Sequence, residues 1–422
     1  MAHLLFDGCD AVDLAREFGT PLYVLSEDRI RVRIRELRET FLDRWPGTSA
    51  AYASKALQTL DLCRIVASED LDLDVVAGGE LYAALKAGFP PGRIHFHGNS
   101  KTPDEIRMAL DGGVGRMIVD NRTELEILDR EARARGIRVP ILFRVTPGVD
   151  SHTHQYMSTG GLDSKFGIPL DPAVRDEYVG AALRMEGIEL RGFHFHVGSQ
   201  IFSNESHRKA LRIVADLAAE VRDRYGFETR ELILGGGFAA RYTAQDEPEP
   251  LAYYTDALMT DLRDLCAGSG LPMPRVGIEP GRWIVAEAGI TLYTVGSVKE
   301  IPGVRTYVGV DGGMPDNIRP ALYGAEYEAT VADRHDEPRT RTVTVAGKCC
   351  ESGDILIRGI ALQDPRPGDV LAVFTTGAYT HSMASNYNRL PRPAMVLVRD
   401  GKARLSVRRE TYEDLTAREL LS

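Results

Sequence analysis

The chain has 422 residues, of which 51 are lysine or arginine and 61 are aspartate or glutamate, so its formal charge is −10. This excess of acidic residues argues against a protein that binds nucleic acids or anionic membranes, because such partners require a basic surface. With 43% hydrophobic and 27% charged residues, the composition is that of a globular protein, and the length is enough for two or three domains.

We expect neither a membrane-spanning helix nor a secretory signal in this sequence. No apolar run approaches the ~18 residues of a membrane-spanning helix, and the first residues do not pair a basic stretch with an apolar one. The five cysteines have no Cys-x-x-Cys spacing, and they are Cys9, Cys63, Cys266, Cys349 and Cys350. Neither a disulfide framework nor a zinc ribbon is predicted, and we expect a cytoplasmic protein with reduced thiols.

Short apolar or β-branched segments alternate with helical patterns over the first two thirds of the chain. The strands are predicted at 50–54, 71–76, 94–97, 116–119, 141–145, 190–197, 232–234 and 276–278. Helices are predicted between them, at 79–87, 102–111, 122–135, 205–225 and 251–267. The alternation predicts an α/β fold with a parallel sheet, and the count of eight favours a closed (β/α)8 barrel with an inserted loop at 150–171.

After about residue 288 the pattern changes to strands separated by glycine, proline and aspartate turns. These strands are predicted at 306–310, 327–332, 340–345, 354–360, 370–374, 394–398 and 403–407. They indicate an all-β C-terminal domain, a sandwich or barrel, to which we expect residues 21–24 to add. The predicted domains are therefore a barrel at 27–288 and a β domain made of 1–26 and 289–422.

The carboxyl ends of the predicted barrel strands should carry the active site. Lys55 follows the first of these strands, and a lysine amine that is desolvated in a pocket is a nucleophile that forms Schiff bases. Most lysines are solvated surface residues, but the place of Lys55 at a strand end inside the predicted pocket favours the nucleophile.

Three consecutive glycines, Gly235, Gly236 and Gly237, follow a later strand. Alone they would be interpreted as a turn, and they match neither the Gly-Lys-Ser/Thr nor the Gly-x-Gly-x-x-Gly phosphate motif. Backbone N–H groups in such a turn can still cradle a phosphate, and Ser199 and Arg282 are predicted at the same rim. A lysine imine beside a phosphate site points to pyridoxal phosphate.

Glu279 ends the eighth predicted strand, where a carboxylate would keep the pyridine nitrogen of that cofactor protonated. His196 is expected to stack on the ring. His194 and His196 also form a His-x-His pair, but metal-dependent barrels place this pair on the first strand and add further ligands, so no metal site is predicted. For the pair His152 and His154 we expect a structural or loop-closing role.

These residues lie in stretches that resemble diaminopimelate decarboxylase, within the fold-type III pyridoxal-phosphate decarboxylases. The stretches are YASKA (52–56), HGNSKT (97–102), RVTPGVDSHTH (144–154), TGGLDSKFG (159–167), HFHVGSQI (194–201), LGGGF (234–238), EPGRWIVAEAG (279–289), VDGGMPDNIRPALYGA (310–325), GKCCESGD (347–354) and TGAYTHSMASNYNRLPRP (376–393). The resemblance runs nearly end to end. It implies decarboxylation of meso-2,6-diaminopimelate at its D-centre to L-lysine, the last step of lysine biosynthesis, through a Schiff base on Lys55.

The resemblance also implies residue roles. The catalytic residues would be Lys55, His196, Glu279 and Cys350, the last as proton donor. The residues that bind the cofactor would be Lys55, His196, Ser199, Gly235, Gly236, Gly237, Glu279, Pro280, Gly281, Arg282 and Tyr379. Substrate would contact Arg282, Arg319, Tyr323, Glu351 and Tyr379. Two departures are Cys349, where some relatives carry histidine or tyrosine, and Thr146, where many carry asparagine.

The resemblance further implies a homodimer in which the β domain completes the active site of the partner subunit. One alternative is a related decarboxylase that acts on D-lysine, D-ornithine or a carrier-bound amino acid. A substrate with a single carboxylate would leave Arg319 unpaired, which argues against this alternative. A pyridoxal-phosphate carrier would have no use for the C-terminal domain. Alanine racemase is expected to place an arginine at the pyridine nitrogen, not a carboxylate.

Overall fold

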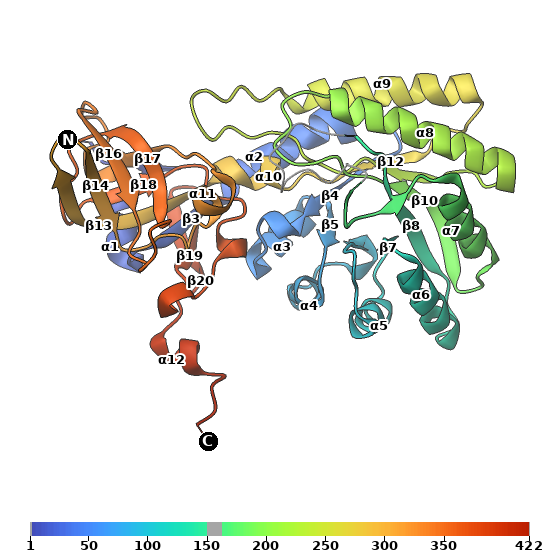
Figure 1. The fold of residues 1–422 in the computed structure, drawn as a ribbon, viewed down its shortest axis with the longest axis horizontal. Coiled ribbons are helices and arrows are strands. Elements are labelled where there is room, and N and C mark those ends of the chain that lie inside the picture. Colours follow the sequence, from blue (N-terminus) through green and yellow to red (C-terminus); the bar gives the residue numbers. More distant parts are fainter. Residues whose placement is uncertain (1, 150–162, 422) are drawn as a thin grey trace. The chain divides into compact units, whose positions relative to one another are not determined.

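The computed structural model describes residues 2–149 and 163–421 and divides into two compact units (Figure 1). The barrel unit comprises Ile34–Ala239 and Pro248–Trp283, and the β unit comprises Met1–Arg33, Ala240–Glu247 and Ile284–Ser422. The short segment Ala240–Glu247 leaves the barrel unit for the β unit, which the sequence analysis did not foresee. None of the described helices is both long and apolar enough to cross a membrane.

Eight parallel strands form the centre of the barrel unit in the described residues. They are β4 (Thr48–Ala53), β5 (Asp72–Val75), β6 (Ile94–Phe96), β7 (Arg116–Val119), β8 (Val139–Thr146), β10 (Ile188–His194), β11 (Glu231–Ile233) and β12 (Arg275–Ile278). Each pairs in parallel with its neighbour, and pairing of β10 with β8 and of β12 with β4 closes the ring. The predicted (β/α)8 barrel is confirmed.

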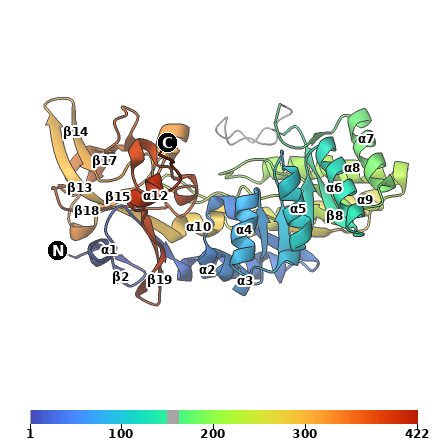
Figure 2. The ribbon, with the colours of Figure 1, turned by 90° about the horizontal axis from the view of Figure 1, so that it is seen from below.

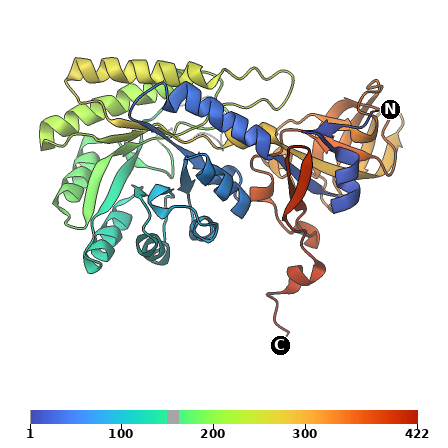
Figure 3. The ribbon, with the colours of Figure 1, turned by 180° about the vertical axis from the view of Figure 1, so that it is seen from behind.

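Helices surround this ring, and their ends carry the expected capping residues. They are α3 (Leu60–Ser68), α4 (Gly78–Lys86), α5 (Pro103–Gly112), α6 (Arg122–Ala134), α7 (Pro172–Arg184), α8 (Glu205–Tyr225) and α9 (Leu251–Ser269). Thr102 and Glu105 form a capping box that starts α5, and left-handed Gly226 and Gly270 end α8 and α9. The two longest, α8 and α9, pack side by side (Figure 1 and Figure 3).

The interior of the barrel is unusually polar near the carboxyl ends of its strands. Ile118, Leu142 and Ile233 form a small apolar cluster inside the ring. Such barrels are ordinarily filled with layers of branched apolar side chains. Here Asp74, one residue before the end of β5, and His97, which follows β6, are buried instead. Burying polar groups costs free energy unless they are hydrogen-bonded, so a cluster of them at this end of the barrel indicates a functional site.

The β unit is built on a sheet with the strand order β17-β16-β14-β13-β3-β19-β20, while β18 pairs with β13 and β15. The strands are β3 (Leu22–Ser26), β13 (Gly289–Ile301), β14 (Arg305–Val310), β15 (Ala329–Val331), β16 (Arg341–Ala346), β17 (Ile355–Leu362), β18 (Val370–Val373), β19 (Ala394–Arg399) and β20 (Lys402–Val407). The predicted all-β domain is confirmed, and β3 joins it between β13 and β19, as expected for residues 21–24.

The strand β13 was not predicted, although it pairs with β14, β18 and β3. Its second half is mostly exposed, so the sequence there has no apolar alternation. The helix α1 (Ala11–Phe18) packs beside β13 and β18 (Figure 2). Leu14 of this helix and Leu22 of β3 share one core with Val396 of β19, so the two ends of the chain fold together.

Candidate active site

Lys55 lies just beyond β4, in the short turn Ser54–Ala56. Its side chain is exposed at the carboxyl end of the barrel. Its charge opposes the rise in the pKa of Asp74 that burial and Glu279 cause, and it contributes to the lowered pKa of His196, so the amine lies near the ends of β5 and β10. The structure thus places the predicted nucleophile at the edge where the other candidates gather.

Glu279 follows β12 and is held between two histidines. His194 Nε2 donates to Glu279 Oε2 at 3.0 Å, and His97 Nε2 lies 2.9 Å from Oε1 without the angle of a good hydrogen bond. Burial acts to raise the pKa of Glu279, but His97 and His194 together lower it well below its usual value. Burial also lowers the pKa of both histidines, that of His97 to about 3. Glu279 is therefore a carboxylate between two neutral imidazoles.

Asp74 is the second buried acid of this cluster. Its Oδ1 lies 3.7 Å from His97 Nε2, and burial, followed by repulsion from Glu279, raises its pKa well above the usual value. Two like charges so close together in a buried site cannot both persist. The negative charge is accordingly on Glu279, while Asp74 keeps its proton. Arg144 is buried nearby and balances that charge, although burial lowers its pKa.

The three glycines form a turn into which no side chain would fit. A Cβ at Gly236 would lie 2.1 Å from the Glu279 carbonyl oxygen, and one at Gly237 would lie 2.4 Å from the Gly198 carbonyl oxygen. The Gly236 N–H donates to His196 Nδ1 at 3.3 Å. This bond assigns the proton of the neutral imidazole to Nε2 and fixes the ring beside the turn.

Ser199 and Arg282 also meet at this edge of the barrel unit. Arg282 Nη2 donates to Ser199 Oγ at 3.0 Å, and the guanidinium group is buried. Pro280 and Gly281 connect Arg282 to Glu279, and the Pro280 carbonyl accepts from the Ala53 N–H at 3.2 Å. The structure therefore brings together all the predicted site residues that belong to the barrel unit.

Arg319 lies in the β unit, at the start of α11 (Arg319–Tyr323). Its guanidinium carbon is 5.2 Å from the ring centroid of Tyr323, 5.5 Å from that of Tyr379 and 6.0 Å from that of Tyr242. The residue is 5% exposed, and its Nε–H has no hydrogen-bond partner among the described residues. A buried cation with an unfilled donor, enclosed by aromatic rings, is suited to an anionic group of a ligand.

Cys350 and Glu351 lie in an exposed turn of the β unit, between β16 and β17. Glu351 Oε1 accepts from the Gly353 N–H at 3.1 Å, within the turn itself. Cys349 is half-buried, and burial together with Asp354 raises its pKa to about 12. Of the two adjacent thiols, Cys350 is the one that faces outward.

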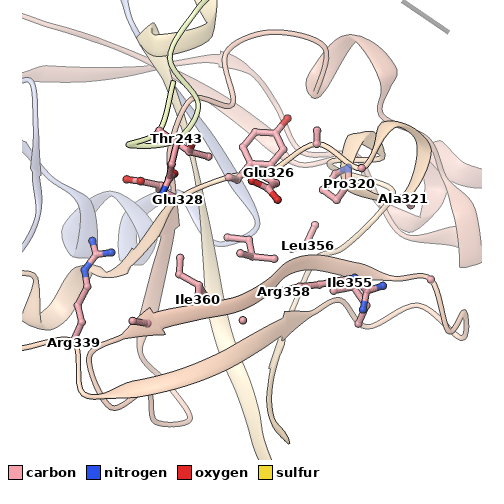
Figure 4. A pocket seen from close by; sticks show the side chains of 18 residues that line it. Thr243, Pro320, Ala321, Glu326, Glu328, Arg339, Ile355, Leu356, Arg358 and Ile360 are labelled. Atoms are coloured by element: carbon pink, nitrogen blue, oxygen red, sulfur yellow. The ribbon is translucent and has the colours of Figure 1, made fainter. Parts of the chain in front are cut away.

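A hollow of about 570 Å³ lies in the β unit behind these segments. Figure 4 shows Pro320 and Ala321 of α11 facing Ile355 and Leu356 of β17 across it. The turn that carries Cys350 continues into β17, and Gly353 also lines the hollow. The turn is therefore exposed to solvent on one side and borders the hollow at Gly353.

Sequence reasoning missed the partners of Glu279. His97 and Arg144 appeared only within the stretches that carry the resemblance, and Asp74 was not singled out. A usable signal was the alternation of Asp72 and Asp74 within an otherwise apolar strand, because alternate residues face the same side. His95, His97 and Glu279 also offer ligand atoms within 4.8 Å of one another. His152 and His154 lie outside the described residues.

The comparisons with known proteins agree with this geometry. A family profile described as "Pyridoxal-dependent decarboxylase, pyridoxal binding domain" matches residues 28–286. The chain is 48% identical over 418 residues to the diaminopimelate decarboxylase of Bacillus subtilis (strain 168), covering 99% of this chain and 95% of that protein. The structure of diaminopimelate decarboxylase from M. jannaschii in co-complex with L-lysine has a TM-score of 0.94 at 35% identity, covering 100% and 96% of the two chains. That from Helicobacter pylori complexed with L-lysine has a TM-score of 0.87 at 32% identity, covering 96% and 98%.

Proposed function

We propose that this chain, which belongs to the pyridoxal-dependent diaminopimelate decarboxylase family, removes the carboxyl group at the D-configured centre of meso-diaminopimelate. The products are L-lysine and carbon dioxide, and the cofactor is pyridoxal 5′-phosphate. The proposal is supported by relatives whose structures hold L-lysine, which would be the product here.

The observation that carries the choice of substrate is the buried Arg319 with its unfilled Nε–H. Diaminopimelate has a second amino-acid centre at its far end, and the carboxylate of that centre would satisfy this donor in a forked, charge-assisted pair. D-lysine and D-ornithine have no such carboxylate, so a buried charge would stay unpaired. Glu351 would supply the opposite charge for the distal ammonium group.

The residues of the barrel unit fit the cofactor. Glu279 Oε1 is buried and lacks a well-formed hydrogen bond, so it can accept one from the pyridine nitrogen. Lys55 would hold the cofactor covalently, with His196 beside the ring. The phosphate would lie among the N–H, hydroxyl and guanidinium donors of Ser199, Gly235, Gly236, Gly237, Gly281 and Arg282, with Pro280 shaping the turn, and Tyr379 of the β unit would add a hydroxyl group. When bound, the cofactor supplies an electron sink for the electrons that departing carbon dioxide leaves behind.

The remaining steps belong to the chain's own residues. Glu279, ionised between His97 and His194, keeps a proton on the pyridine nitrogen and so preserves the electron sink. Arg319 and Glu351 fix the L-centre of the substrate, which selects the D-centre for reaction. Cys350 then donates the proton that replaces the lost carboxyl group. This role suits a thiol, because thiols as a class have a pKa near neutrality.

We also propose a homodimer, in which Cys350 of the partner subunit serves the barrel unit of each chain. The exposure of Cys350 supports this assignment, because a proton donor needs access to substrate. A cytoplasmic location is proposed from the five cysteines, all of which are free thiols in the structure.

The experiment is a substrate panel with purified holoenzyme. With meso-diaminopimelate we expect one carbon dioxide for each L-lysine, and a kcat/KM that exceeds the value for D-lysine or D-ornithine by about 30- to several-thousand-fold, the effect of one buried charged pair. Lys55→Ala is the inactive control. Equal activity on D-lysine would instead support the related decarboxylase, and release of no carbon dioxide from any substrate would leave only a cofactor-binding protein.

A further inference from the structure

Two segments of the β unit meet on the carboxylate of one buried residue, Asp354. Its Oδ1 accepts from the Met314 N–H at 2.6 Å, and its Oδ2 accepts from the Cys349 N–H at 2.8 Å. The side chain is 2% exposed. The first segment leads to Arg319, and the second carries Cys350. One carboxylate therefore joins the segment that leads to the proposed substrate arginine to the segment that carries the proposed proton donor.

The surrounding backbone is shaped for this carboxylate. A Cβ at Gly313 would lie 2.5 Å from Asp354 Oδ2, and a Cβ at Gly347 would lie 2.2 Å from the same atom. Two main-chain hydrogen bonds complete the junction, from Gly347 N to Asp354 O and from Lys348 N to Gly312 O, both at 2.9 Å. Only glycine at these two positions lets the carboxylate approach both segments so closely.

A second side chain holds the next residue of the turn. Asn388 Oδ1 accepts from the Cys350 N–H at 2.7 Å. Asn388 has a φ of 52°, a left-handed conformation that asparagine tolerates better than most residues. Successive N–H groups, those of Cys349 and Cys350, are thus fixed by two acceptors that come from different parts of the chain.

The other hydrogen bonds of the turn are internal to it, from the Glu351 N–H to the Cys349 carbonyl oxygen and from the Gly353 N–H to Glu351 Oε1. Its residues 350–353 are exposed, and Gly353 lines the hollow that Figure 4 shows. Apolar packing stabilises a segment only in proportion to the area that it buries, and an exposed turn beside a hollow buries little. Such packing is also non-directional, so it would not orient the turn. The hydrogen bonds to Asp354 and Asn388 are therefore the side-chain contacts that hold the N–H groups of Cys349 and Cys350.

We propose that Asp354 and Asn388 are positioning residues for the reaction: they orient the turn so that the Cys350 thiol, and not the Cys349 thiol, is presented for proton donation. This inference rests on the proposed function, because it requires Cys350 to be the donor. The half-buried place of Cys349 agrees with it, since burial and Asp354 together raise the pKa of that thiol to about 12 and so make it a weaker proton donor.

The test compares Asn388→Gly, Asn388→Asp and Asp354→Asn with wild type, all as holoenzymes. Glycine keeps the left-handed backbone but removes the acceptor, while aspartate restores an acceptor. Asn388→Gly should lower kcat about twofold to tenfold, the loss expected for one ordinary hydrogen bond, and should leave KM within about threefold. Asn388→Asp should recover most of this loss. Asp354→Asn should lower kcat at least as much, because an amide cannot accept from two N–H groups as a carboxylate does.

Two further readouts separate positioning from loss of structure. A misplaced donor would let the proton reach the cofactor carbon in place of the substrate carbon. Water would then cleave the bond between them, releasing the substrate as an aldehyde and leaving the cofactor as its amine, so the fraction of turnovers that end in the amine form should rise in Asn388→Gly and Asp354→Asn. The rate of alkylation at Cys350, followed by mass spectrometry, should change in the same variants. The matched controls are Asn386→Ala, in the same loop, and Asp369→Asn, a buried acid that accepts from Arg366 and Arg334. Neither control should change the amine fraction.

The outcomes distinguish this inference from the proposed function. If wild type does not decarboxylate meso-diaminopimelate, or Cys350→Ala is fully active, the proposed function or its donor is wrong. If wild type is active and Cys350→Ala is not, but the Asn388 and Asp354 variants keep wild-type kcat, alkylation rate and amine fraction, the positioning role alone is refuted. A fall in kcat without a rise in the amine fraction also refutes it.

Discussion

Replacing Glu279 with glutamine tests the electrostatics of the site most sharply. The substitution Glu279→Gln keeps the size of the side chain but removes the only group of the cluster that we assign a negative charge. His194 Nε2 donates to the carboxylate at 3.0 Å and His97 Nε2 lies 2.9 Å from its other oxygen, so the N–H group of an amide would face one of these two nitrogens. The pyridine nitrogen would then lose both its counter-charge and a clean acceptor.

The size of the effect follows from breaking a buried charged pair by removing one partner. That loss is about 3–5 kcal/mol, or on the order of 10²- to 10⁴-fold in kcat. The assay is the steady-state release of carbon dioxide from meso-diaminopimelate by enzyme saturated with cofactor. KM should change much less than kcat, because Glu279 is assigned to the cofactor and not to the substrate.

Asp74→Asn is the matched control, because burial and Glu279 already keep Asp74 protonated. An amide in its place changes no charge, so we expect a loss of less than about tenfold in kcat, the cost of one rearranged hydrogen bond. A loss as large as that of Glu279→Gln would show that Asp74 carries the negative charge, and it would refute the assignment of charge within the cluster.

The remaining predictions concern specificity, pH and assembly. Arg319→Met should cut kcat/KM for meso-diaminopimelate by about 30- to several-thousand-fold and leave the value for D-lysine nearly unchanged; an equal loss for both substrates would make Arg319 structural. Burial raises the pKa of Asp316 to about 7 in the folded protein, whereas its pKa in the unfolded chain is near 4. The folded state therefore binds this proton more tightly, and the resulting stabilisation is complete below pH 4. Between pH 4 and 7 the free energy of unfolding should fall by up to about 1.4 kcal/mol per pH unit. Urea unfolding of Asp316→Asn at pH 5, 6 and 7 should lack that slope, and an unchanged slope would contradict the burial argument. Mixed Lys55→Ala and Cys350→Ala proteins should recover about a quarter of wild-type activity, because half the dimers carry one intact site of two; no recovery after proven subunit exchange would exclude shared sites.

The fold was largely predictable because its signals are local. Eight apolar segments alternating with helical patterns predicted the closed barrel, and turn residues predicted most strands of the β unit. The strand β13 escaped prediction because its exposed second half depends on pairing with β14, not on burial of its own side chains. The transfer of Ala240–Glu247 to the β unit escaped for a similar reason, since no local pattern marks it.

The candidate site was predictable where strand ends reveal it. Lys55, Glu279 and the first glycine of the turn lie within two residues of a strand end, so the rule that barrel sites lie at carboxyl ends was enough to single them out as candidates. The charge state of Glu279 was not predictable, because it depends on two histidines from other strands and on how deeply all three are buried. Asp354 was missed as well, because it accepts a hydrogen bond from the N–H of Met314, 40 positions away, and no local pattern shows such a contact.

The most direct test of the central claim is to run the reaction in D₂O with meso-diaminopimelate and to locate the label in the product. Loss of carbon dioxide at the D-centre, followed by delivery of one solvent-derived deuteron to the same carbon, predicts L-lysine with a single deuterium at its ε-carbon. The L-centre should keep its hydrogen, because Arg319 and Glu351 hold that end away from the reaction. Deuterium at the α-carbon, formation of D-lysine, or lysine released without an equal amount of carbon dioxide would contradict the account.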